Sequence, residues 1–402
     1  MKTVRFSISR IFLLFSMLAL FSGITEGGSP SVADRLTIRH GSMQTAGIDP
    51  EKIEKIQEML AKGLADSAYP GGVFIGVRNG VVFAEIPFGN LTYTKDTSPM
   101  TVETIFDLAS VSKVIGTTSA IMLLYDDGLL KLDQKVGDLI PEFCQNGKDN
   151  VTIRQLLTHS SGLPAWEKLW KKGKTPAEML DYLYALSLSY RSDSATVYSC
   201  LGFITLGKVC EKLAGKPLDI FLSERLFVSL KMNRTGYNPS AKLIDEIAPT
   251  EFDAERGGIV HGKVHDENAY WFGGVSGNAG LFSTAEDMAV FAQMMLNGGI
   301  YDGKRIFREE TVQLFTSRQN IVDGSNWALG WDTPTGTSSA GRYFSKKSFG
   351  HTGFTGTCIW IDPEKNLIGI LLTNRVHPTR ANQKLYDFRD QIYDLLRESA
   401  ID

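Results

Sequence analysis

Two segments near the ends of the chain carry the pattern of β-hairpins. Residues 73–77 and 81–86 are rich in β-branched and aromatic side chains, and the Asn-Gly pair at 79–80 between them is a strong turn signal. Residues 358–361 and 367–372 are a second pair of apolar runs, separated by the turn sequence Pro-Glu-Lys-Asn. The sequence therefore predicts two hairpins, one from each end of the chain.

An amphipathic helix accompanies each predicted hairpin. Residues 49–51 read Asp-Pro-Glu, a typical helix start, and apolar residues follow at helical spacing (53, 56, 60 and 64). Residues 382–398 show the same spacing after the second hairpin. This arrangement indicates an α+β fold, in which one antiparallel sheet is built from both chain ends and is flanked by helices.

The middle of the chain is rich in helix signals. Apolar spacing and capping residues predict helices at residues 110–127, 151–158, 176–186, 201–213 and 288–296. We therefore expect an all-helical domain, residues 106–299, inserted into a sheet domain formed by residues 45–105 and 300–402.

The first 28 residues differ from the rest. Lys2, Arg5 and Arg10 precede an apolar run of residues 11–21, which small residues follow. This is the layout of a secretory signal peptide, and the apolar run is too short for a stable membrane span. We expect an exported protein, periplasmic or secreted. The alternative is an uncleaved segment that associates the protein with a membrane.

Composition and charge exclude several classes of protein and one class of partner. Of 402 residues, 43% are hydrophobic and 22% are charged, which excludes disordered, collagen-like and coiled-coil chains. The 42 Lys and Arg against 45 Asp and Glu give a net charge of −3, so no basic surplus is present to bind nucleic acid. A small molecule or a peptide is the expected partner.

Metal and cofactor sites are not indicated. His261 and His265 are four residues apart, but no Glu follows the first and no third ligand is evident. No Cys-x-x-Cys, phosphate-binding loop or Gly-x-Ser-x-Gly motif occurs. The Gly-rich residues 273–280 follow no clear strand, so they indicate a turn where backbones approach closely.

The four cysteines are expected to be buried thiols. Cys200 and Cys210 fall on one predicted helix, where ten residues separate them by about 15 Å, too far for a disulfide. The other two are Cys144 and Cys358.

The remaining chemical signal is a Ser-x-x-Lys motif formed by Ser110 and Lys113. Positions three apart share a helix face, so the hydroxyl and the ammonium can meet. In a cleft, desolvation would lower the pKa of Lys113 and allow it to take the serine proton. The alternative is a helix-capping serine with a solvated lysine.

The chain resembles the serine β-lactamase and penicillin-binding protein superfamily over about residues 45–395. Residues 108–113, Leu-Ala-Ser-Val-Ser-Lys, resemble the nucleophile motif of this superfamily, and residues 152–164 are similar to a family segment that shapes the helical domain. Tyr198-Ser-Cys200 resembles the Tyr-x-Asn motif of the class C branch, and His351-Thr352-Gly353 resembles the Lys-Thr-Gly motif on the strand edging the cleft.

The resemblance implies a role for each motif residue. Ser110 would form an acyl-enzyme, and Tyr198, its pKa lowered by Lys113, would act as general base; Lys113 is the alternative base. Backbone N–H groups of Ser110 and Phe354 would hold the oxyanion. His351 and Thr352 would contact a substrate carboxylate or polar end, with Gly353 between that pair and Phe354. His159 is expected to be structural and to satisfy helix-end groups.

Two residues depart from the family pattern. Cys200 stands where Asn is usual, so an amide contact to the substrate is lost; we expect its side chain in the cleft between Ser110 and His351. His351 replaces the usual Lys, so carboxylate binding would depend on pH. The expected function is a D-alanyl-D-alanine carboxypeptidase-like or β-lactamase-related serine hydrolase without a cofactor. The alternatives are a carboxylesterase and a non-catalytic binding homologue.

Overall fold

The computed structural model describes residues 37–335 and 338–401. The predicted signal peptide, residues 1–28, lies outside this part of the chain. Across the described residues, no helix has both the length and the apolar character needed to cross a membrane.

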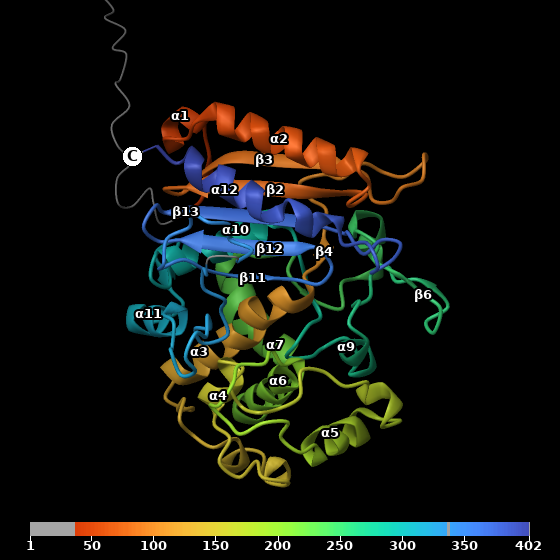
Figure 1. Cartoon of the computed structure of the whole chain (residues 1–402), viewed down its shortest axis with the longest axis vertical. Helices are drawn as coiled ribbons and strands as arrows, with labels where there is room; N and C mark the ends of the chain where they lie inside the picture. Colours follow the sequence, from red (N-terminus) through yellow and green to blue (C-terminus); the bar gives the residue numbers. More distant parts are fainter. Residues whose placement is uncertain (1–36, 336–337, 402) are drawn as a thin grey trace, which may run out of the picture.

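A six-stranded sheet joins the two ends of the chain (Figure 1). The pairing of Ile75 with Ile370 lies at the seam, where the N-terminal hairpin meets the C-terminal one. All neighbours are antiparallel except the first pair. In spatial order the strands are β1 (Arg39–His40), β3 (Val81–Gly89), β2 (Gly71–Arg78), β13 (Leu367–Thr373), β12 (Thr357–Asp362) and β11 (Phe349–Thr352). The predicted fold class and both hairpins are confirmed.

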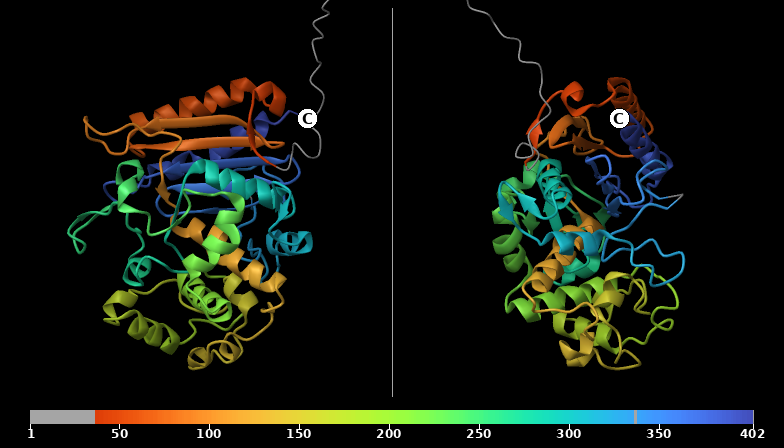
Figure 2. Two further views of the ribbon diagram at one scale, coloured as in Figure 1. Left: turned by 180° about the vertical axis from the view of Figure 1, so that it is seen from behind. Right: turned by 90° about the vertical axis from the view of Figure 1, so that its left-hand side faces the viewer.

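Helices cover both faces of this sheet. Helices α2 (Pro50–Ala65) and α12 (Arg389–Ser399) lie on one face, and α10 (Ala285–Leu296) lies on the other (Figure 2). Side chains alternate along a strand, so Phe74 packs into the core beneath α2 and α12, whereas Val73 and Ile75 pack into the larger core. Strand β2 is buried along its whole length for this reason.

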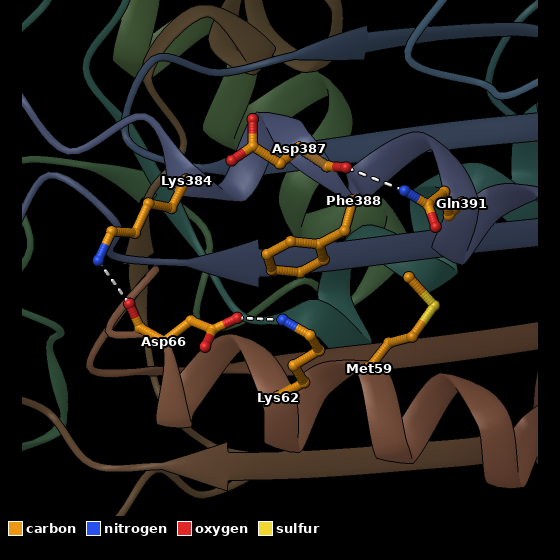
Figure 3. Close-up of a pocket in the computed structure, with 7 residues that line it drawn as sticks. All are labelled: Met59, Lys62, Asp66, Lys384, Asp387, Phe388 and Gln391. Carbon is orange, nitrogen blue, oxygen red and sulfur yellow. Dashed lines mark hydrogen bonds and ion pairs between the residues drawn. The ribbon is translucent and has the colours of Figure 1, made fainter.

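The two terminal helices meet over a surface cavity of about 670 Å³ (Figure 3). Phe388 lies in the gap, and Lys62 and Asp66 of the α2 end form an ion pair. Lys384 Nζ donates to the backbone oxygen of Asp66 at 2.7 Å, which ties the C-terminal segment to the end of α2. The predicted helix at 382–398 is divided here into a 3-10 turn, Lys384–Asp387, and α12.

The middle region is helical but not all-helical, so that prediction was wrong. Strand β8 (Leu281–Ser283) lies between β4 (Phe106–Asp107) and β5 (Gly236–Tyr237) in a second sheet, and β6 (Phe252–Asp253) pairs with β7 (Gly258–Ile259). Strands of two or three residues are too short to show a period in the sequence. Helix α10 falls within the predicted inserted domain, residues 106–299, yet it packs on the main sheet. The predicted domain boundary at residue 299 therefore stays a prediction.

The predicted helices of the middle region are present, with one change in geometry. Residues 110–127 form a 3-10 turn (Ala109–Val111), a π-helical stretch (Lys113–Thr118) and α3 (Ser119–Asp126) instead of one regular helix. The other helices here are α4 (Ile153–Leu157), α5 (Pro176–Ala185), α6 (Cys200–Ala214), α7 (Leu218–Leu222), α8 (Val228–Leu230) and α9 (Glu267–Trp271). Outside it lie α1 (Met43–Ala46), β9 (Ile300–Tyr301), β10 (Lys304–Arg305) and α11 (Glu309–Thr316).

The cysteines are free thiols, but they are not all buried as expected. Cys210 and Cys358 are buried, Cys200 is partly exposed and Cys144 is exposed. Cys144 follows a short 3-10 turn, Pro141–Phe143, at the surface, where the sequence shows no apolar period.

Packing of α12 on the sheet predicts the effect of one substitution. A Cβ on Gly369 would overlap Leu396 and lie 2.9 Å from Tyr393 Cε1, so Gly369→Ala should lower the free energy of unfolding by about 1–3 kcal/mol. Gly236→Ala is the matched control, because its Cβ would meet open space. Urea unfolding measures both, and equal stability of the two variants would contradict this packing.

Candidate active site

The turn that carries Ser110 is held by a buried carboxylate. Ala109, the residue before it, has φ of 46°, a left-handed conformation that costs a residue with a Cβ roughly 1 kcal/mol. Asp107, at the end of β4, accepts the N–H of Ala109 at 2.8 Å and the N–H of His265 at 2.6 Å. Burial raises the pKa of Asp107, and these N–H groups favour its ionised form. The strained turn is thereby fixed in place.

Ser110 and Lys113 meet as the motif predicts. Lys113 Nζ donates to Ser110 Oγ at 3.0 Å and to the backbone oxygen of Asn278 at 2.8 Å. The Lys113 side chain is fully buried. The alternative of a solvated lysine is therefore wrong, because the ammonium lies inside the protein against the serine hydroxyl.

Tyr198 completes a buried cluster with this pair. Lys113 Nζ lies 5.0 Å from the centre of the Tyr198 ring, and Lys113 and Ser110 both lie close enough to the Tyr198 hydroxyl to favour its ionised form. Burial raises the pKa of Tyr198, and the charge of Lys113 opposes this only in part. The expected lowering of the Tyr198 pKa was wrong, because the phenolate loses more by leaving water than it gains from the ammonium.

The pKa of Lys113 also differs from the expectation. Burial lowers it, but the neighbouring Cys200 and Tyr198 raise it, and the net pKa is raised. The charge of Lys113 is therefore coupled to the ionisation of these two neighbours, and burial raises the pKa of both.

The strand β11 and the loop after it are fastened to the nucleophile turn. Thr355 Oγ1 donates to the backbone oxygen of Asp107 at 2.7 Å, and Thr357 Oγ1 donates to that of Leu108 at 2.9 Å. A Cβ on Gly353 would overlap the Leu108 oxygen, so only glycine permits this approach. Phe354, the next residue, lines the same cavities as Ser110.

His351 is buried and neutral. Its Nδ1 lies 2.7 Å from the backbone oxygen of Thr352, and its Nε2 has no hydrogen-bond partner among the described residues. Burial and the positive charge of Lys113 lower the pKa of His351 to about 3. The expected charged, pH-dependent contact with a carboxylate is therefore not available from this imidazole near neutral pH.

Two cavities open beside Ser110, of about 330 and 300 Å³. They share Ser110, Tyr198 and Phe354. Cys200 lines the first, and His351, Thr352 and Gly353 line the second. Cys200 is therefore in the cleft as expected, but on the side of Ser110 away from His351. It opens α6, whose N-cap is Ser199, and this places the thiol at the cavity wall.

The Gly-rich segment and His159 have the roles that the sequence predicts. Residues 273–280 approach α6 closely: a Cβ on Gly277 would lie 2.9 Å from the nitrogen of Gly207. This approach presents the Asn278 oxygen to Lys113, a contact that no sequence signal indicated. His159 Nδ1 accepts the N–H of Ser199 at 3.0 Å and so supports the N-terminus of α6, next to Tyr198.

Sequence reasoning missed several residues of the cleft. Trp327, Asp332 and Tyr386 line the cavity that holds His351. None belongs to a recognisable motif, and they come from loops or a short 3-10 turn far from Ser110 along the chain. Within residues 37–335 and 338–401, no cluster of His, Cys, Asp and Glu could hold a metal ion.

Known proteins are similar to this chain in sequence. The chain is 34% identical over 373 residues to a Bacillus subtilis N-acetylmuramyl-L-alanine amidase, with 83% of each chain covered. It is 30% identical over 405 residues to a putative D-alanyl-D-alanine carboxypeptidase of Escherichia coli K12, with 92% of each covered.

Solved structures with lower identity have the same fold. A penicillin-binding protein homologue from Caulobacter crescentus superimposes with a TM-score of 0.69 at 22% identity, over 88% of this chain and 98% of that one. The hydrolase EstCE1 gives 0.68 at 21%, over 86% and 98%. The β-lactamase family matches residues 56–394. With its Ser-x-x-Lys pair assembled in the cleft, this chain is a serine hydrolase that belongs to the β-lactamase family.

Proposed function

We propose that the chain is an exported hydrolase that cleaves amide bonds of peptidoglycan-type peptides through an acyl-enzyme on Ser110, with D-alanyl-D-alanine carboxypeptidase-like activity. The main support is the 3.0 Å hydrogen bond from the buried Lys113 ammonium to Ser110 Oγ. The names of the amidase and carboxypeptidase relatives support an amide substrate. Export rests on residues 1–28, which are outside the described residues.

The reaction begins when Ser110 Oγ attacks the carbonyl carbon. Tyr198 first loses its own proton to solvent, and the charge of Lys113 stabilises the resulting phenolate. The phenolate then takes the proton of Ser110 as the new bond forms. Backbone N–H groups of Ser110 and Phe354 stabilise the oxyanion. Tyr198 then gives the proton to the leaving amine, and water releases the acyl group from Ser110. We assign the base to Tyr198, because the charge of Lys113 favours its phenolate form.

A carboxylesterase is the second candidate. Cys200 lines the cavity of about 330 Å³ beside Ser110, and its neutral thiol is a poor partner for an amide. A simple ester carries no amide in its acyl side chain that would need such a partner, so this cavity suits it. The assembled Ser110–Lys113 pair argues against the non-catalytic alternative.

The nucleophile is tested by substitution. Ser110→Ala should abolish turnover of activated esters and labelling by a fluorescent penicillin, and Lys113→Ala should be nearly as damaging because the two act as a unit. Folding should survive the serine change, which removes one oxygen. Ser194→Ala, an exposed serine, is the control. Wild-type hydrolysis by Ser110→Ala would overturn the proposed function.

The base is tested by pH. Because the pKa of Tyr198 is raised, its active, deprotonated form is scarce at neutral pH, so kcat/KM for a neutral ester should rise with pH and continue to rise above pH 8. Tyr198→Phe should cut the rate by about 10²–10⁴. Tyr93→Phe, on the surface, serves as control. A loss below tenfold would transfer the base role to Lys113.

Substrate preference is tested at Cys200. Cys200→Asn places an amide beside Asn278 and Lys113, and one regained hydrogen bond of about 0.5–1.5 kcal/mol should raise kcat/KM for amides or β-lactams roughly 2- to 13-fold. Small esters should change little. Paired kinetics and melting temperatures measure both effects. A lower melting temperature with unchanged preference would refute a substrate contact at this position.

A further inference from the structure

The cavity beside β11 lacks a cation on its surface. Among the nine residues that line it, the neutral His351 cannot hold a negative charge, and Asp332 is itself an acid. A carboxypeptidase nevertheless has to recognise the carboxylate at the end of its substrate. Arg380 lines the adjoining cavity, but Glu251 and Glu267 already form ion pairs with it, so the positive charge is expected behind the lining residues.

Two arginines lie directly behind one wall of this cavity. The guanidinium carbons of Arg375 and Arg389 are 4.7 and 5.0 Å from the centre of the Tyr386 ring. Arg375 also lies 4.8 Å from the centre of the Phe354 ring. Tyr386 and Phe354 both line the cavity with Ser110, and 38% and 44% of their surfaces are exposed. The aromatic wall is therefore backed by two positive charges.

These guanidinium groups are poorly satisfied. Arg375 is fully buried, and its Nε and Nη2 make no hydrogen bond to a described residue; the same holds for Arg389 Nε. Arg375 Nη1 donates to the backbone oxygens of Asn382, at 2.5 Å, and of Arg380, at 3.4 Å. No ion pair joins either arginine to a carboxylate of residues 37–335 or 338–401. Buried donors without partners are rare in native proteins and indicate a missing acceptor.

We propose that the carboxylate of the substrate is recognised at the Tyr386 wall of the His351 cavity, with Arg375 and Arg389 supplying the positive charge. The Tyr386 hydroxyl donates to the carboxylate. The positive charges of the two guanidinium groups attract the carboxylate across the Tyr386 ring. This recognition rests on the proposed function and takes over the role that the sequence assigned to His351.

Asp332 shares this cavity and opposes an anion there. Its carboxylate accepts a hydrogen bond from Asn326 Nδ2, and Arg318 and Arg389 lie close enough to lower its pKa, although burial raises it to about 6. Its charge is thus compensated by neighbours other than Arg375. Three arginines thus face Asp332 and, beside Arg375, Glu251, which leaves one positive charge in excess.

The test compares two substrates that differ only in charge. N-acyl-D-alanyl-D-lactate and its C-terminal carboxamide share one scissile ester, so either an amidase or an esterase can cleave them. The wild-type ratio of kcat/KM, carboxylate over carboxamide, should fall about tenfold or more in Arg389→Met and in Arg375→Met. The half-buried Arg389 gives a variant that folds if Arg375→Met does not.

Arg342→Met is the matched control, because this arginine also stacks on a tyrosine, 4.9 Å from the Tyr343 ring, but outside the cavity. Its ratio should equal that of the wild type. A ratio within twofold of wild type in both Arg389→Met and Arg375→Met would overturn the inference. Failure of the proposed function looks different: both substrates would then be cleaved equally by Ser110→Ala.

Discussion

Burial of the Lys113 ammonium is the constraint on which the rest of the cleft depends. A charge without solvent needs acceptors, and among the described residues Lys113 Nζ donates to Ser110 Oγ and to the Asn278 oxygen. The Asn278 oxygen is available because glycines at 207 and 277 let two backbones approach closely. The reactivity of the serine therefore depends on packing between α6 and a loop that contributes no catalytic side chain.

The same charge determines which neighbours can be ionised. It lowers the pKa of His351 and of His159, and burial acts in the same direction on both, so the two imidazoles are neutral. It favours a phenolate at Tyr198, yet burial leaves the phenol protonated at rest. One buried cation thus disfavours a second cation beside it, which is why the positive charge for an anionic substrate group is expected farther away, behind Tyr386.

The sequence predicts the sheet and the nucleophile pair well, and the electrostatics poorly. Hairpins and the Ser-x-x-Lys motif are local patterns, so their period or spacing is visible in the chain. The pKa directions of Lys113 and Tyr198 depend on how completely both are buried beside Cys200, which spacing does not reveal. Asp107, Asn278 and Tyr386 reach the cleft only through tertiary contacts, and no motif marks them.

The joining of both chain ends in one sheet explains where the arginines come from. Arg375 follows β13, the strand that pairs with the N-terminal hairpin, and Arg389 opens α12, which packs with α2. Their positions therefore depend on the main sheet, whose strands β2 and β13 are buried throughout, whereas Ser110 lies in the turn that follows β4 of the second sheet. Thr355 and Thr357 connect the two by their hydrogen bonds to the nucleophile turn. These side-chain-to-backbone hydrogen bonds hold the nucleophile turn against the strand that leads to Arg375, so the proposed carboxylate site and Ser110 are positioned by the same contacts.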